Sequence, residues 1–131
     1  TIPKNWLVQL PEINYKMAYT AVCRILNSDT VPNAFFAASD ILAMAIIRAI
    51  KRYHFKVPRD IMVVGFDNIE FCSITVPSIT TVSQPRFQMG YSACEILIEM
   101  LLNPASEVKS ILLDTELVIR ESTSANYLHT P

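Results

Sequence analysis

Residues 34–66 read AFFAASDILAMAIIRAIKRYHFKVPRDIMVVGF, and this stretch decides the fold class. It opens with a continuous apolar run at 34–38, typical of a strand that is covered on both faces. Apolar residues at helical spacing then predict a helix over 41–53, and a second buried strand follows at 61–66. A strand, a helix and another strand in this order indicate a right-handed crossover unit on a parallel sheet.

The same alternation continues on both sides of this stretch, so we expect an α/β fold with a doubly wound parallel sheet. Asn14 can cap the helix predicted to follow it, and Pro85 suits the first turn of a later helix. The further strands are predicted at 6–10, 79–83, 111–113 and 117–119, and the further helices at 15–27 and 86–102.

The composition fits one compact domain, or one small domain and part of another. The chain has 131 residues, of which 51% are hydrophobic and 18% charged, and this balance excludes intrinsic disorder. The mean hydropathy is high, +0.30, yet cations such as Arg48 interrupt the longest apolar run before it reaches the ~18 residues of a membrane span. We therefore expect no membrane partner, and a dense core or a subunit interface.

Charge and cysteine content indicate where the chain works. A net charge of −1 argues against a dedicated nucleic-acid surface, which needs clustered cations. Cys23, Cys72 and Cys94 are odd in number and set in apolar patterns, so we expect buried thiols in a reducing compartment. Residues 1–9 lack the pattern of a signal peptide, and the expected location is the cytoplasm.

The residues of common catalytic and metal sites are not grouped in this sequence. Phosphate-binding loops and nucleophile elbows need several nearby glycines, and the chain has only Gly65 and Gly90. His54 and His129 have no metal-ligand partner at suitable spacing. The sequence predicts no catalytic residue, no metal and no cofactor.

The carboxyl ends of the predicted parallel strands are where a ligand is expected. Residues 11–14, Ser39 with Asp40, and Asp67 with Asn68 stand at these ends. Two acids and two neutral polar residues at one edge would suit the hydroxyl groups of a sugar-like ligand. Asp67 is either a ligand acceptor or a turn acid, two interpretations of about equal weight, whereas Asp40 is more simply explained as a helix cap.

Two clusters are open to more than one interpretation. Five of the 11 Lys and Arg residues lie within 48–59, and a solvated helix face explains them better than a phosphate site. The apolar residues Phe71, Cys72 and Ile74 follow Asp67 closely. They are either an interface patch or simply a buried loop.

Four blocks of this sequence occur in an order and at a spacing that are specific. They are NAFFAASDILAMA at 33–45, VPRDIMVVGFDN at 57–68, PSITTVSQPRFQMG at 77–90 and TELVIRES at 115–122. Together they resemble the LacI/GalR family of bacterial transcriptional regulators, and the resemblance covers residues 6–122.

The resemblance implies the C-terminal part of an effector-binding, dimerising domain with the fold of periplasmic binding proteins. Residues 1–83 would form an incomplete C-terminal lobe, 84–114 a portion of the N-terminal lobe, and 115–131 the return to the first lobe and a tail. Operator DNA would be bound only by a helix-turn-helix head upstream of this chain.

The resemblance also assigns residues. Asp67 falls on the acid that contacts the effector, Ser39 where many members have Asn, and Ile13 where many have a stacking aromatic. Gln84 lies at the hinge edge of the cleft, and Asp40 completes the candidate set. Segments 40–53 and 70–76 match the dimer surface, and the predicted interface residues on them are Met44, Ile47, Arg48, Phe71, Cys72 and Ile74.

Two other classes of protein compete with this interpretation. A piece of a periplasmic sugar-binding transport protein would share the fold but rarely has the TELVIRES ending. A small enzyme of flavodoxin-like architecture is disfavoured because glycine-rich loops are missing.

Overall fold

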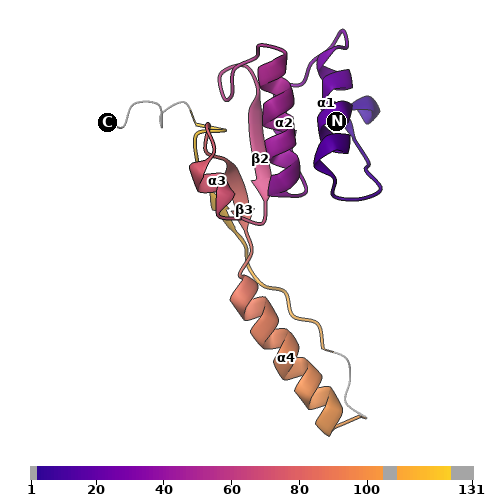
Figure 1. Ribbon diagram of the computed structural model, residues 1–131. Coiled ribbons are helices and arrows are strands. Elements are labelled where there is room, and N and C mark those ends of the chain that lie inside the picture. Colours follow the sequence, from indigo (N-terminus) through magenta and orange to yellow (C-terminus); the bar gives the residue numbers. More distant parts are fainter. Residues whose placement is uncertain (1–2, 105–108, 125–131) are drawn as a thin grey trace, which may run out of the picture.

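The computed structural model describes residues 3–104 and 109–124. Strands and helices alternate through its first part, as the sequence predicts, and a long helix follows (Figure 1). The elements are η1 Lys4–Trp6, α1 Tyr15–Leu26, β1 Ala34–Phe36, α2 Asp40–Arg52, β2 Met62–Phe66, α3 Phe71–Ile74, β3 Thr80–Ser83, α4 Arg86–Leu102 and β4 Glu116–Val118.

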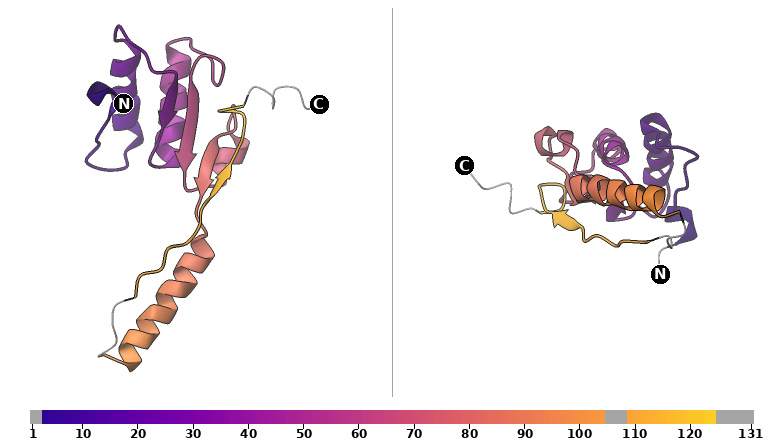
Figure 2. Two further views of the ribbon diagram at one scale, coloured as in Figure 1. Left: turned by 180° about the vertical axis from the view of Figure 1, so that it is seen from behind. Right: turned by 90° about the horizontal axis from the view of Figure 1, so that it is seen from below.

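The four strands form one sheet in the order β1-β2-β3-β4. The first three are parallel, while β4 runs antiparallel to β3. Helices α1, α2 and α3 lie on one face of this sheet (Figure 2), and we call the sheet with these helices the lobe. The opposite face exposes Phe36 and Met62, so the described residues hold one of the two helix layers of a doubly wound sheet.

The core of the lobe lies between α2, its neighbour α1 and the sheet. The apolar stripe of α2 accounts for it, because Ala43, Ala49 and Ile50 are completely buried against Val63 of β2 and other core residues. The predicted cap of α1 is confirmed, since Asn14 Oδ1 accepts a hydrogen bond from the Met17 backbone at 3.1 Å. Such a cap stabilises a helix by about 1 kcal/mol.

Two predicted strands are wrong. Residues 4–6 form a single 3-10 turn, and residues 7–10 and 111–113 belong to no strand. Leu7 and Leu112 are well exposed. The physical reason is that an apolar run becomes a strand only beside another strand, because strand preference depends strongly on neighbours.

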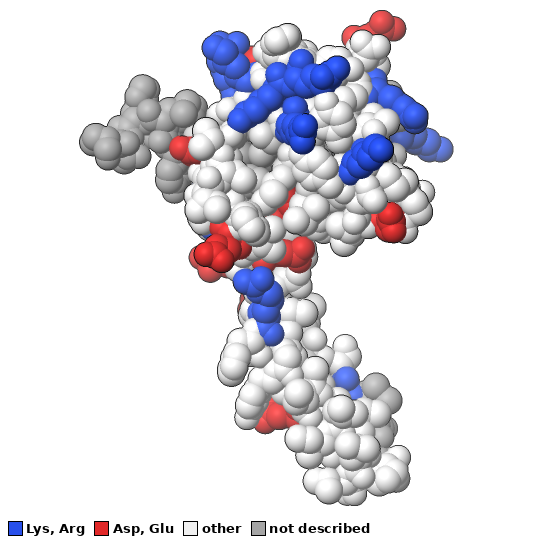
Figure 3. Space-filling model, viewed as in Figure 1, with Lys and Arg blue, Asp and Glu red and all other residues white. Residues whose placement is uncertain are grey.

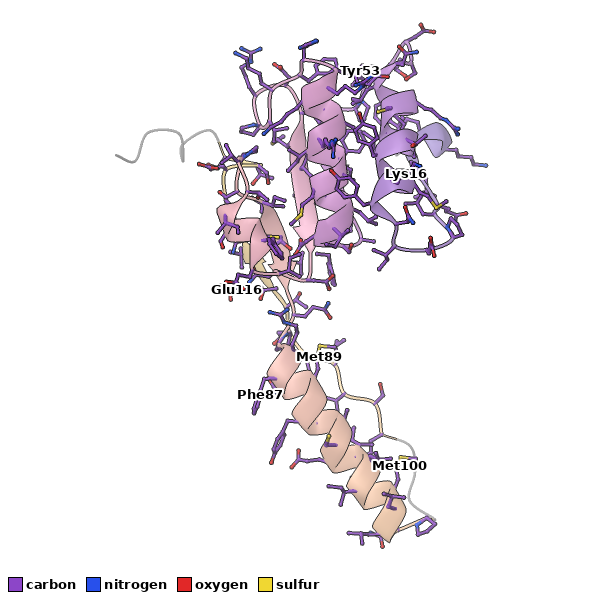
Figure 4. The ribbon with its side chains drawn as sticks, in the orientation of Figure 1. Lys16, Tyr53, Phe87, Met89, Met100 and Glu116 are labelled. Atoms are coloured by element: carbon purple, nitrogen blue, oxygen red, sulfur yellow. The ribbon has the colours of Figure 1, made fainter. Side chains whose placement is uncertain are left out.

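Helix α4 extends away from the lobe and has no buried residue (Figure 1). Its apolar side chains lie on more than one side: Phe87 points away from Met89 and Met100 in Figure 4. Cys94 on this helix is exposed and Cys23 on α1 is half-buried, which corrects the expectation that all three thiols are buried. No helix among the described residues combines the length and apolarity needed to cross a bilayer.

Residues that follow α4 in sequence complete the lobe. The buried hydroxyl of Ser122 donates to Val63 O at 2.6 Å and accepts from the Thr80 backbone at 2.8 Å. Thr80 Oγ1 in turn accepts from the Arg120 backbone at 2.7 Å. The lobe is therefore built from two stretches of sequence with α4 between them.

Candidate functional site at the carboxyl edge of the sheet

The carboxyl ends of β1, β2 and β3 all lie at the end of the lobe that faces α4 (Figure 1). Ser39 and Asp67 follow two of these strands, and Gln84 follows the third. The loop before α1 turns at the same end because α1 runs opposite to the strands. Figure 3 shows most Lys and Arg of the lobe at the far end and several Asp and Glu near α4. The edge thus favours ligands that donate hydrogen bonds.

The turn after β2 has an unusual backbone. Asp67 and Asn68 have φ angles of 110° and 50°, a region that few non-glycine residues adopt. The Asp67 N–H donates to Val82 O at 2.9 Å, and the Asn68 N–H donates to Thr81 Oγ1 at 3.2 Å. Backbone strain of this kind is held in place by surrounding contacts and occurs often at functional sites.

The carboxylate of Asp67 lies beside the connection to α4. Gln84 Nε2 donates to its Oδ1 at 2.7 Å. A carboxylate offers about four lone-pair positions, so this bond leaves acceptor capacity for ligand hydroxyls. The structure therefore brings two of the predicted site residues into direct contact.

Arg120 supports the next residue of the turn. Its Nη2 donates to Asn68 Oδ1 at 2.9 Å and its Nη1 donates to Ile79 O at 2.8 Å. Asn68 Nδ2 in turn donates to Ser83 Oγ at 3.2 Å. Sequence reasoning missed this role for Arg120, although the residue stands inside a recognised block, because its partner is 52 residues away.

Ser39 carries an orphaned hydroxyl. It is the N-cap residue of α2, only 3% exposed, and its Oγ has no hydrogen-bond partner among the described residues. A buried polar group without a partner costs about 1–3 kcal/mol. This hydroxyl is therefore suited to a hydrogen bond with a bound molecule.

Asp40 is not a cleft residue, which corrects its place in the predicted set. It is 1% exposed, and its oxygens accept from Thr81 Oγ1 at 2.6 Å and from the Ile69 backbone at 2.9 Å. It is also the first residue of α2 rather than its cap.

Burial, with the neighbouring Asp40 carboxylate as a second cause, raises the pKa of the Cys72 thiol to about 12.

Ile13 lies on the loop before α1 and is exposed. It lines a hollow of about 560 Å³ together with Trp6, Phe36 and other apolar residues. The loop that carries Ile13 turns at the same end of the lobe as the carboxyl ends of the strands that Ser39 and Asp67 follow.

The predicted interface residues lie on α2 and α3, where Arg48, Phe71 and Ile74 are exposed and Met44 is half-buried, whereas Ile47 is buried in the core of the lobe. Phe71 and Ile74 are 60% and 68% exposed, which favours an interface patch over a buried loop. Met44, Ile47 and Arg48 line a hollow of about 300 Å³ beside them. Cys72 is corrected, because its side chain is fully buried in the lobe.

The described residues hold no group of three or more His, Cys, Asp or Glu that could bind a metal ion. His54 is an exposed residue just after α2, and His129 lies outside the described part of the chain.

A family model described as a periplasmic binding protein-like domain matches residues 6–123. The HTH-type transcriptional repressor PurR of Klebsiella pneumoniae is 34% identical over 124 residues. This alignment covers 95% of the chain and 36% of the repressor. The chain thus spans about a third of the length of such curated relatives.

Solved structures of regulators are similar as well. The transcriptional regulator CelR in complex with cellobiose matches with a TM-score of 0.83 and 30% identity, over 92% of this chain and 37% of that one. A LacI family transcriptional regulator from Enterococcus faecalis with bound ribose matches with a TM-score of 0.76 and 31% identity. This match covers 86% of this chain and 42% of that one.

Proposed function

Because the chain belongs to the periplasmic binding protein-like family of LacI-type transcriptional regulators, we propose that it senses a sugar-like effector. The family consists of regulators and not of enzymes. The effector would bind between the carboxyl edge of the lobe and the part of the protein that holds α4. The observation that carries this proposal is the Asp67 carboxylate beside Gln84 at that edge.

The chemistry of the edge supports a ligand rich in hydroxyl groups. Asp67 accepts hydrogen bonds, Gln84 can donate and accept, and the Ser39 hydroxyl needs a partner. A charged acceptor makes bonds about twice as strong as a neutral one. Cellobiose and ribose, the ligands of two similar regulators, carry many such hydroxyls.

The exposed apolar surface of α4 supports the proposed domain division. A soluble chain rarely leaves a large apolar surface uncovered, so α4 requires a partner. We assign 84–114 to an N-terminal lobe whose remaining residues come from elsewhere in a longer protein. Residues 1–83 and 115–131 would then belong to the C-terminal lobe.

We further propose a homodimer that uses the α2–α3 surface, in a protein that works in the cytoplasm. A two-fold contact places the same patch of each copy against the other. Operator DNA would be bound by a head outside this chain. With its net charge of −1, the chain alone should give no sequence-dependent gel shift at physiological salt.

Replacement of Asp67 by Ala in the full-length protein tests the effector site. Calorimetric titrations with D-ribose, cellobiose and lactose should show binding of at least one sugar by the parent. The variant should lose about 1.5–3 kcal/mol of binding free energy, which is a factor of about 10 to 100 in affinity for the sugar. The matched control is Asp29→Ala, which removes an exposed acid in the loop after α1.

Unchanged affinity in the Asp67 variant would remove this residue from the site. A thermal melt separates binding from folding. If the melting temperature of Asp67→Ala collapses while that of Asp29→Ala does not, Asp67 is a structural turn acid instead.

A further inference from the structure

We propose that Asp40 and Thr81 are positioning residues that fix the direction of the Asp67 carboxylate from inside the lobe. They touch no ligand in this proposal and act through the backbone of the turn at 67–69. The inference rests on the proposed effector role of Asp67.

Three successive backbone N–H groups hold this turn against the lobe. Those of Asp67 and Asn68 donate to Val82 O and to the Thr81 hydroxyl. The next N–H, of Ile69, donates to Asp40 Oδ2 at 2.9 Å. Two of the three acceptors are therefore side-chain oxygens, on residues far from the turn in sequence.

The two side chains form one unit. Thr81 Oγ1 donates to Asp40 Oδ1 at 2.6 Å, which leaves its lone pairs directed toward Asn68 N–H. Thr81 and Asp40 are 0% and 1% exposed, so water does not compete for these bonds. The Thr81 hydroxyl thus connects the Asp40 carboxylate to the backbone of Asn68, the second residue of the turn.

Gly65, which has no side chain, leaves room for the Asp40 carboxylate. A Cβ atom on Gly65 would lie 2.2 Å from Asp40 Oδ1, so any other residue there would displace the acid. A buried charge is weak evidence for stability, since apolar replacements of similar volume are often as stable. A role in conformation accounts better for an acid that holds the Ile69 N–H directly after the two residues with positive φ, and the Thr81 hydroxyl that bonds one of them.

Without these acceptors the left-handed backbone at 67–68 has less to hold it, because residues of this kind relax unless their surroundings fix them. Relaxation would turn the Asp67 carboxylate away from Gln84 and from the cleft. The proposal therefore predicts that the contribution of Thr81 to sugar binding passes through Asp67.

A double-mutant cycle in the full-length protein tests this prediction. Thr81→Val keeps the shape of the side chain but removes the hydroxyl, whereas Thr81→Ser keeps the hydroxyl. D-ribose, cellobiose and lactose are titrated against the parent, each Thr81 variant, Asp67→Ala and the double variant Asp67→Ala/Thr81→Val.

We expect Thr81→Val to weaken binding by about 5- to 50-fold and Thr81→Ser to stay within about threefold of the parent. In the Asp67→Ala background, Thr81→Val should change affinity by less than about twofold. The same fold loss in both backgrounds, or no loss in either, overturns the inference while leaving Asp67 in the site. If Asp67→Ala binds like the parent, the proposed function fails first and the inference fails with it.

A second measurement needs neither a ligand nor the Thr81 variants. In Asp40→Asn, amide hydrogen exchange at Asn68 and Ile69 should quicken at least about tenfold, while exchange at Ile50 in α2 stays unchanged. Unchanged exchange at the turn overturns the inference. Quickened exchange across the whole lobe also overturns it, because Asp40 would then be a general core residue.

Discussion

The Gln84 side-chain amide lies 2.7 Å from Oδ1 of Asp67 and donates a hydrogen bond to it. Gln84 stands in the connection between β3 and α4, so the proposed effector acid is bonded to the link that leaves the lobe. If Asp67 binds the effector, as we propose, this contact would couple occupancy of the acid to movement of the connection.

Replacing Gln84 by Glu should make sugar binding depend on pH. Two carboxylates would face each other, and their repulsion raises the pKa of the pair. We expect weak binding at pH 7.5 and partial recovery at pH 5, when the pair holds a proton. Gln84→Met adds no charge. In calorimetry, its loss of sugar affinity should be smaller and the same at both pH values.

The stability of the Gln84→Glu variant provides an independent check of the same repulsion. A pair with a raised pKa binds more protons in the folded than in the unfolded chain, so folding is favoured as pH falls. Relative to the parent, its melting temperature should rise between pH 7.5 and pH 5. If the difference in melting temperature between the variant and the parent stays constant over this range, residues 84 and 67 are not in contact.

Ile74→Asp should shift the protein from dimer to monomer. Ile74 is exposed on α3, and a dimer contact there would bury an unpaired carboxylate. Light scattering at tens of micromolar measures the change, since stable interfaces persist at such concentrations. Ile119→Asp, at an exposed position after β4, should leave the dimer intact; a monomeric parent would count against the interface.

The two glycines should respond oppositely to Ala. In Gly65→Ala the new Cβ meets Asp40 Oδ1 and the Ala43 side chain, and overpacking of this kind costs about 1–3 kcal/mol. In Gly90→Ala the new Cβ meets nothing within 4 Å, and α4 gains about 1 kcal/mol of helix preference. Chemical denaturation measures the change in the free energy of unfolding for each variant. Equal changes would show that the surroundings of Asp40 are not tightly packed.

The thiols should differ in reactivity. Cys94 is exposed on α4, while Cys72 is buried with a pKa raised to about 12. At pH 8 a disulfide reagent should modify Cys94 quickly in this chain and Cys72 only after denaturation, because the thiolate is the reactive form. Fast modification of Cys72 in the folded chain would contradict its buried position beside Asp40.

Local sequence rules predict those parts of the fold that local contacts decide. The apolar stripe of α2, the Asn14 cap and the end of β2 at Asp67 all follow from residues within one element. The candidate edge was predictable as well, because parallel strands bring their carboxyl ends to one side.

The remaining features depend on partners distant in the sequence. Residues 6–10 lack a neighbouring strand, so their apolar character says little about their structure. Asp40 has the residue type of a cap, yet it is the first residue of α2 and its carboxylate accepts a hydrogen bond from Thr81, 41 residues away. Arg120 likewise gains its role only when the return segment meets Asn68.

The position of Ser122 has a consequence for synthesis on the ribosome. Its hydroxyl completes hydrogen bonds to Val63 and Thr80, but the roughly 40 residues after β3 need about 2–8 s to be translated. During that interval β1, β2 and β3 lack both β4 and the hydrogen bonds of Ser122, and the apolar helix α4 is already exposed to chaperones. Arrested nascent chains of increasing length should gain protease resistance only once Ser122 has left the exit tunnel.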